Sequence, residues 1–132
     1  MPTAIQVRRT AITSPELTPP VGPFSQATEA GGFIYFSGQV GQDPTTGKLV
    51  AGGIAAETNR IFQNLSAVLK AAGKSFDNVV RAGVYLANMN DFVAMNGIYA
   101  KHFSQPFPAR TTIAVAALPL GACVEIDLVV KA

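Results

Sequence analysis

The chain has 132 residues and a net charge of +2, so we expect one domain spanning residues 1–132. Hydrophobic residues make up 48% and charged residues only 14%, which leaves few charges to cover a monomer and favours a buried subunit interface. The ten basic residues are scattered, which argues against an electrostatic nucleic-acid surface. One cysteine and one histidine exclude an internal disulfide, a zinc cluster and a histidine-rich metal site.

The first residues, 1–9, lack the long apolar core of a signal peptide, and no apolar run in the chain approaches the length of a membrane span. We therefore predict a cytoplasmic protein. Residues 4–7 favour a first strand, whereas residues 10–23 hold four of the nine prolines and predict an irregular connector. A compact strand is predicted next at Phe33–Ser37, which glycines flank on both sides.

The clearest predicted helix runs from about Gly53 to Ala72, after a turn signal at Asp43–Gly47 and a short strand at Leu49–Val50. Its apolar positions follow the i, i+4, i+7, i+8 spacing that is typical of one stripe facing a core. Gly73 supplies the C-terminal stop. The stripe comprises Ile54, Thr58, Ile61, Phe62, Leu65, Val68, Leu69 and Ala72.

The second half of the chain predicts a strand at Val79–Ala87 and a helix from Asn90 or Asp91 to about Phe103. Two further strands, Arg110–Leu118 and Ala122–Val130, flank a short loop, which favours antiparallel pairing between them. The strand at 79–87 is expected to place four residues on one face, and the helix stripe has four members. These sets are Val80, Ala82, Val84 and Leu86, and Phe92, Met95, Tyr99 and Phe103.

This order of elements predicts an α+β domain, because one sheet with both amphipathic helices on one face covers each helix. The other sheet face then stays uncovered by its own chain, which is typical of an oligomer contact. Strand alternation places Glu125 and Asp127 on that face, with Val129, Ala114 and Ala116 as expected neighbours.

Arg110 stands out because it opens an otherwise apolar strand soon after two prolines, Pro106 and Pro108. Removing a guanidinium from water costs several kcal/mol (~5) unless an anion meets it, and its fork matches a carboxylate in two contacts. Arg110 is therefore either an anchor for a small carboxylate ligand or half of a structural ion pair. The pattern leaves both interpretations open.

Other polar positions also allow two interpretations each. Glu125 lies either on a solvated sheet face or, half-buried near Arg110, where it would orient a water molecule and move a proton. The glycine-flanked loops at 22–26 and 37–39 are either ordinary turns or segments whose backbone approaches a ligand. On the second helix, Asn96 is placed to reach a site, Tyr99 is assigned to the core, and Cys123 is interpreted as a buried inert thiol.

Six sequence blocks follow one another along the chain: GPFSQA, SGQ, LKAAGKSFDNVV, MNDFVAMNGIYAKHF, FPAR and VEID. In this order they resemble the YjgF/Rid family of reactive-intermediate (enamine/imine) deaminases, once also described as endoribonucleases and translation inhibitors. The resemblance covers residues 10–131 and implies a chorismate-mutase-like fold and a homotrimer with sites between subunits. It also implies cofactor-free hydrolysis of 2-aminoacrylate-type enamines, through their imines, to 2-keto acids and ammonia.

The resemblance also implies roles for individual residues. The carboxylate-binding arginine of the family falls on Arg110, the water-positioning glutamate on Glu125, and a backbone contact on Thr112. No metal ligand is implied. The remaining lining positions fall on Ser37, Gly38 and Asn96.

One position departs from the family pattern, because Phe24 stands where the family commonly has tyrosine. Phenylalanine keeps an apolar wall but lacks the hydroxyl. This departure supports an alternative in which the protein binds small carboxylates with little turnover. The sequence also leaves open a 2-aminomuconate-type deaminase of aromatic catabolism, and an RNA-cleaving translation inhibitor, against which the missing basic stripe argues.

Overall fold

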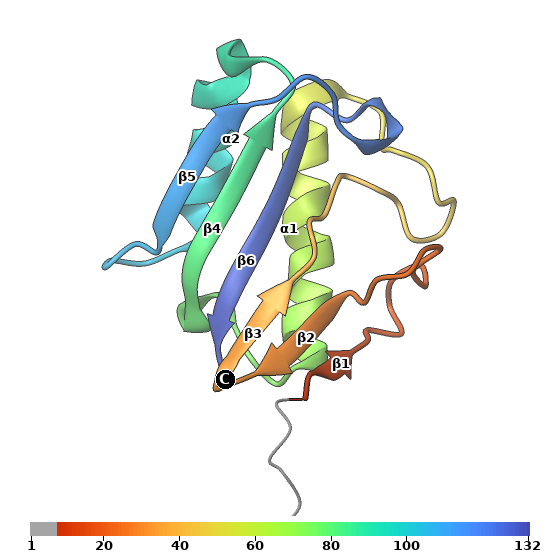
Figure 1. Ribbon diagram of the computed structural model, residues 1–132. Helices are drawn as coiled ribbons and strands as arrows, with labels where there is room; N and C mark the ends of the chain where they lie inside the picture. Colours follow the sequence, from red (N-terminus) through yellow and green to blue (C-terminus); the bar gives the residue numbers. More distant parts are fainter. Residues whose placement is uncertain (1–7) are drawn as a thin grey trace, which may run out of the picture.

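The strands form one mixed sheet in the order β1-β2-β3-β6-β4-β5 in the computed structural model, which describes residues 8–132 (Figure 1). Neighbouring strands are antiparallel except β4 and β5, which are parallel. The predicted strand at residues 4–7 lies outside the described residues. The bounds are β1 Thr10–Ile12, β2 Ala27–Ala30, β3 Phe33–Phe36, β4 Val79–Leu86, β5 Ala109–Ala114 and β6 Val124–Lys131.

Two α-helices cover the same face of this sheet, as Figure 1 shows, and the α+β prediction is confirmed. Four short 3-10 turns accompany them, and no described helix is long and apolar enough to span a bilayer. The second helix ends at Tyr99 rather than Phe103, and its last predicted turn is 3-10. The bounds are α1 Gly53–Ala71, η1 Phe76–Asn78, η2 Met89–Asp91, α2 Phe92–Tyr99, η3 Ala100–His102 and η4 Pro119–Gly121.

The predicted helix stripes form the core between helices and sheet. In α1 the stripe residues Ile61, Leu65 and Val68 are fully buried, and each such side chain stabilises the fold by about 1.5–3 kcal/mol. Gly73 follows the helix with φ +71°, a left-handed conformation that glycine adopts without steric cost. The strand predicted at 49–50 is reduced to a single bridge between Leu49 and Gln42.

The connector predicted at residues 10–23 is irregular only in part, because it begins with β1. That strand pairs with β2, which the sequence did not predict. The reason is length: β1 has three residues and β2 has four, with the composition TAI and ATEA, so neither shows a clear two-residue period. Tertiary pairing with β3 supplies what local pattern lacks.

Strand β4 departs from strict alternation near its start. The pairing with β6 shifts register between Val79 and Arg81, which marks a β-bulge or irregularity. Val79 therefore enters the core, whereas Val80, predicted to point inward, is 42% exposed. The other three inward residues, Ala82, Val84 and Leu86, are buried as predicted.

The predicted hairpin between the last two strands is wrong. Strand β4 lies between β5 and β6, and it pairs parallel with β5 and antiparallel with β6. The chain from β4 through α2 to β5 is a crossover, which makes parallel neighbours, and η4 with its flanks carries the chain over β4 to β6. The short loop predicted pairing of the two consecutive strands. In the structure, however, the α2 crossover lays β5 against the outer side of β4, so β5 and β6 are not neighbours.

This strand order changes the neighbours expected on the open sheet face. Glu125 pairs with Tyr85, and Asp127 pairs with Gly83, instead of lying beside Ala114 or Ala116. The Tyr85 hydroxyl donates a hydrogen bond to Asp127 Oδ2 at 2.9 Å. Within the described part of the chain, no helix covers this face.

Candidate active site in two halves

Arg110 points to the helix-covered face of the edge strand β5. Its register partner is Ala82, which is fully buried, and residues paired directly across strands share a face. Its Nη1 donates a hydrogen bond to Asn96 Oδ1 at 2.8 Å. No carboxylate among residues 8–132 forms an ion pair with it. The guanidinium is thus partly buried without an anionic partner, which removes the structural ion-pair interpretation.

Two neighbours of Arg110 keep polar atoms buried without a hydrogen-bond partner among the described residues. Thr112, two residues further along the same strand face, buries its Oγ1, and Tyr99 buries its hydroxyl. Burial raises the pKa of the Tyr99 hydroxyl, and the positive charge of Arg110 opposes that rise. We call Arg110, Asn96 and Thr112 the Arg110 half of the site.

Glu125 lies on the opposite, open face of the sheet and is half-buried. Burial first, and the negative charge of Asp127 second, raise the pKa of its carboxyl group. Gly38 packs directly against it, and a Cβ atom at Gly38 would overlap Glu125 Oε2. Paired backbone hydrogen bonds between Gln39 and Ile126, at 2.8 and 3.0 Å, hold this loop beside β6.

A hollow of about 300 Å³ opens beside Glu125. Phe24, Ser37, Gly38 and Glu125 all line it, and we call these four residues the Glu125 half. The Ser37 hydroxyl donates to the Ser25 carbonyl at 2.6 Å, so it ties two wall loops together and keeps its lone pairs for a ligand. Four residues that were predicted separately therefore meet in one cavity.

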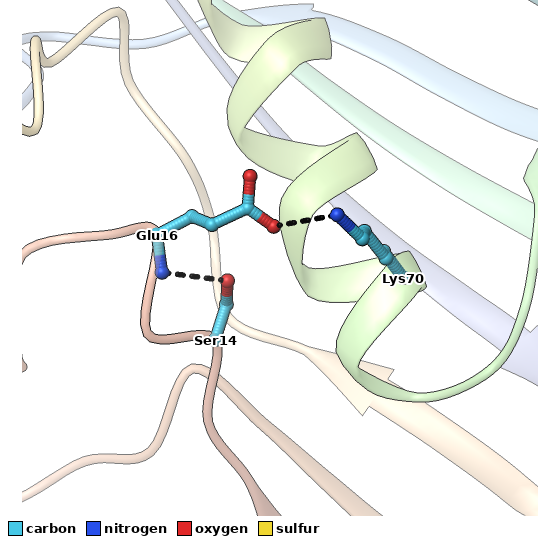
Figure 2. Close-up of polar contacts among 3 residues, drawn as sticks. All are labelled: Ser14, Glu16 and Lys70. Atoms are coloured by element: carbon cyan, nitrogen blue, oxygen red, sulfur yellow. Dashed lines mark hydrogen bonds and ion pairs between the residues drawn. The ribbon is translucent and has the colours of Figure 1, made fainter.

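One side of the hollow is formed by residues 14–26, which we call the wall and which contribute Pro19 and Pro20 to the lining. Buried hydrogen bonds join the two ends of this segment. Ser14 N donates to Gln26 Oε1 at 2.6 Å, and Gln26 Nε2 donates to the Ser14 carbonyl at 3.4 Å. Figure 2 shows the outer contacts, in which Ser14 Oγ accepts from the Glu16 amide and Glu16 pairs with Lys70 on α1 at 3.5 Å. The wall is thereby fastened to the helix.

Two buried polar residues of α1 that the sequence analysis missed also support the site. Asn64 Nδ2 donates to the carbonyls of Gln42 at 3.0 Å and Val40 at 3.3 Å, and it lines the hollow. Glu57 Oε1 accepts from the Cys123 amide at 2.8 Å, two residues before Glu125. Glu57 and Asn64 lie seven residues apart in α1, beside the apolar stripe. This spacing puts them on the same side of the helix and was the signal by which the sequence could have indicated that both are buried.

Cys123 is not activated for chemistry. A hydrogen bond from the thiol itself to the Glu57 carboxylate first, and burial second, raise the pKa of the thiol to about 11. A thiol with that pKa stays protonated at neutral pH, which agrees with the inert part of the interpretation. Cys123 is only partly buried, so the prediction of a buried thiol is wrong in that respect. In the described residues, no three His, Cys, Asp or Glu side chains gather where they could hold a metal ion.

The two halves do not meet within one chain. Arg110 and Glu125 lie on opposite faces of the sheet, with β4 between their strands. Strands spaced at about 4.8 Å separate them by roughly 10 Å laterally, in addition to the sheet itself. The Arg110 half lies outside the residues that line the hollow. The approach of Glu125 to Arg110 that one interpretation requires is therefore absent within a single subunit.

These features define an α+β protein with an unpaired guanidinium and a hollow that holds a half-buried carboxylate. The sequence pattern of the family described as Endoribonuclease L-PSP matches residues 15–132. The chain belongs to this family, which is the YjgF/Rid family.

Relatives and solved structures agree with this membership. The human 2-iminobutanoate/2-iminopropanoate deaminase is 46% identical over 121 residues, which are 92% of this chain and 88% of that protein. A RutC family protein of Pyrococcus horikoshii is 43% identical over 83% of this chain and 87% of its own length. The crystal structure of RidA from an Antarctic Psychrobacter matches with a TM-score of 0.88 at 38% identity, over 94% and 100% of the two chains.

Proposed function

We propose that this protein hydrolyses 2-imino acids to 2-keto acids and ammonia. The observation that carries the proposal is the Arg110 guanidinium, which is partly buried and lacks a carboxylate among the described residues. A guanidinium in such surroundings favours binding of an external carboxylate in two contacts. The deaminase names of relatives 41–46% identical support an imine as the reacting group.

The active site requires a second copy of the chain. Because the two halves lie on opposite faces of one sheet, the Arg110 half of one subunit must meet the Glu125 half of another. The open sheet face, with Tyr35 49% and Ile113 43% exposed, is the surface that such copies would cover. We assign a homotrimer, the assembly that the family resemblance implies.

The proposed reaction starts when Arg110 binds the substrate carboxylate and fixes the position of C2, which supplies much of the catalytic advantage. Glu125 accepts a proton from a water molecule while the oxygen of that water molecule attacks C2 of the imine. Glu125 passes that proton to the nitrogen, which gives an adduct with a hydroxyl and an amino group on C2. The hydroxyl then gives its proton, through Glu125, to the amino group, the C–N bond breaks, and the carbonyl forms as ammonia leaves. The balance is imino acid plus water to keto acid plus ammonia, and Glu125 ends as it began.

Enamines such as 2-aminoacrylate enter the same route after tautomerising to imines. Main-chain groups at Gly38 and Thr112 are proposed to bind the imine nitrogen, with Ser37 beside them. No cofactor or metal is assigned to these steps, since an imine is already electrophilic at C2.

The test is the rate at which 2-iminopropanoate, generated by a coupled amino-acid oxidase, is converted to pyruvate. Arg110→Ala should lower kcat/KM by about 30-fold or more, which corresponds to losing 2–5 kcal/mol of a desolvated charged contact. Lys101→Ala, which removes an exposed positive charge beside α2, is the matched control and should retain the wild-type rate. Equal rates for Arg110→Ala and wild type would contradict the proposal.

A second candidate, carboxylate binding with little turnover, is favoured by one observation. Phe24, 57% exposed at the hollow, has no hydroxyl to hold a water molecule or substrate. Calorimetry with 2-ketobutyrate, beside the turnover assay, separates the two functions. Binding without turnover, with turnover restored in Phe24→Tyr, would support this second candidate, whereas turnover by wild type eliminates it.

A further inference from the structure

The geometry points to Tyr99 as a positioning residue that holds the Arg110 guanidinium ready for a carboxylate. This inference rests on the proposed function in one respect, that Arg110 binds the substrate carboxylate. Pattern analysis assigned Tyr99 to the core, where it does lie, at 5% exposed. Its ring, however, also faces Arg110, with the guanidinium carbon 4.5 Å from the ring centroid.

The contact is part of a stripe along α2. Phe92, Asn96 and Tyr99 follow i, i+4, i+7 spacing, so they lie on one side of the helix. All three touch Arg110: the Phe92 ring at 5.6 Å from its guanidinium carbon, Asn96 through the 2.8 Å hydrogen bond, and Tyr99 through its ring. The helix thus offers the guanidinium two aromatic faces and one neutral acceptor.

This arrangement solves a specific physical problem. An ion-paired arginine would be held firmly but would have its charge already neutralised, whereas a free arginine would lose four side-chain torsions on binding substrate. Aromatic rings attract a cation through their quadrupole without neutralising it. Tyr99 therefore orders the side chain and keeps its charge available, which lowers the entropy lost when a carboxylate binds.

The ring rather than the hydroxyl carries this role. Tyr99 OH is buried and makes no well-formed hydrogen bond among the described residues. It does lie near the Arg110 guanidinium, whose charge and hydrogen-bonding groups act to lower the pKa of this hydroxyl, so Tyr99→Phe separates the contribution of the hydroxyl from that of the ring. The ring also packs against Phe103 at 4.6 Å and Phe62 at 6.0 Å, which fixes its plane. A phenylalanine in place of Tyr99 would keep both the packing and the face toward Arg110.

The experiment compares Tyr99→Leu, Tyr99→Phe and the matched control Phe103→Leu. Phe103 is 8% exposed in the same aromatic cluster, and no contact joins its ring to Arg110, so its loss reproduces the packing defect alone. Calorimetric binding of 2-ketobutyrate and the KM for 2-iminopropanoate are measured on all three variants, with thermal unfolding as the check on folding.

We expect Tyr99→Leu to raise Kd and KM about tenfold while kcat changes less, the range of a partly desolvated cation–π contact. Tyr99→Phe should stay within twofold of wild type, and Phe103→Leu should lose stability but keep its Kd. Wild-type Kd in folded Tyr99→Leu overturns the inference. So does an equal loss of affinity in Phe103→Leu, or in Tyr99→Phe.

A separate readout distinguishes failure of this inference from failure of the proposed function. If wild type neither binds 2-ketobutyrate nor turns over imine, the proposed function fails. The order parameter of the Arg110 Nε–Hε bond, measured by ¹⁵N relaxation, then decides the role of Tyr99. A lower value in Tyr99→Leu but not in Phe103→Leu supports positioning, and equal values in all proteins overturn it.

Discussion

The two halves of the site are built differently. The Arg110 half is held by regular structure, because β5 and the stripe of α2 fix its residues from two sides. In the Glu125 half, Glu125 lies on β6, but Phe24, Ser37 and Gly38 lie on loops. Asn64 of α1 holds the segment that follows Gly38, and the glycine packs against the Glu125 carboxylate. In the Arg110 half, aromatic rings hold the guanidinium in place before substrate binds. In the Glu125 half, the position of the carboxylate depends on the close approach of the Gly38 backbone.

The largest expected effect comes from removing the proton-accepting group of the Glu125 half. Glu125→Gln should lower kcat by about 10²–10⁴-fold, the usual range for a general base, with little change in affinity for 2-ketobutyrate. In wild type, activity should rise with pH as Glu125 ionises, with a midpoint above the ordinary value of 4.5 because burial raises this pKa. The variant should lose that limb of the pH–rate profile.

The same substitution should affect stability in the opposite direction. Because the pKa of Glu125 is raised in the folded state, its stabilising contribution is present below 4.5 and is lost as pH rises through the folded-state value. The difference in unfolding free energy between Glu125→Gln and wild type should therefore grow in favour of glutamine from pH 4 to pH 8. Denaturant titrations across that range measure it, and a constant difference would contradict the shift.

The next effect tests the glycine. Gly38→Ala should lower kcat by about 100-fold, because its Cβ would displace the Glu125 carboxylate by about 1 Å or more. Gly97→Ala on α2 is the control, since no atom lies within 4 Å of a Cβ there. That control should retain activity and gain up to about 1 kcal/mol of helix stability. Full activity in Gly38→Ala would show that Glu125 does not depend on this approach.

A smaller effect is expected from removing the buried hydrogen bonds between Asn64 and the loop that contains Val40 and Gln42. Asn64→Ala leaves the carbonyls of Val40 and Gln42 without their donor and should destabilise the fold by about 1–3 kcal/mol. Asn59→Ala removes an exposed amide that donates only to its own helix at the Ala55 carbonyl, and should cost far less. Chemical denaturation compares the two, and similar losses would mean that the loop is held by other contacts.

The smallest effect belongs to the exposed fastening in Figure 2. Glu16→Ala breaks an ion pair whose side chains are 53% and 77% exposed, so stability should fall by less than about 1 kcal/mol. Activity should be unchanged, because Ser14 and Gln26 still close the wall. The same denaturation measurement checks this. A larger loss of stability would mean that the exposed Glu16–Lys70 ion pair contributes more to the fold than expected of a surface contact.

The sequence by itself determined the elements with strong periodicity and the residues whose chemistry conflicts with their surroundings. The stripe of α1, its stop at Gly73 and the alternation of β6 follow from side-chain spacing, which local geometry enforces. Arg110 was found because a charge in an apolar strand needs an explanation. Phe24, Ser37, Gly38 and Glu125 were selected by resemblance, and they do line one hollow.

Only the tertiary structure decided which strands are neighbours and which face each residue takes. Strand β4 lies between β5 and β6 because the α2 crossover fixes β5 at the edge, a consequence no single segment encodes. The pairing registers place Arg110 and Glu125 on opposite faces of the sheet, and the packing of α2 brings the Tyr99 ring onto the guanidinium. Pairing and packing are non-local, so spacing along the chain cannot fix them.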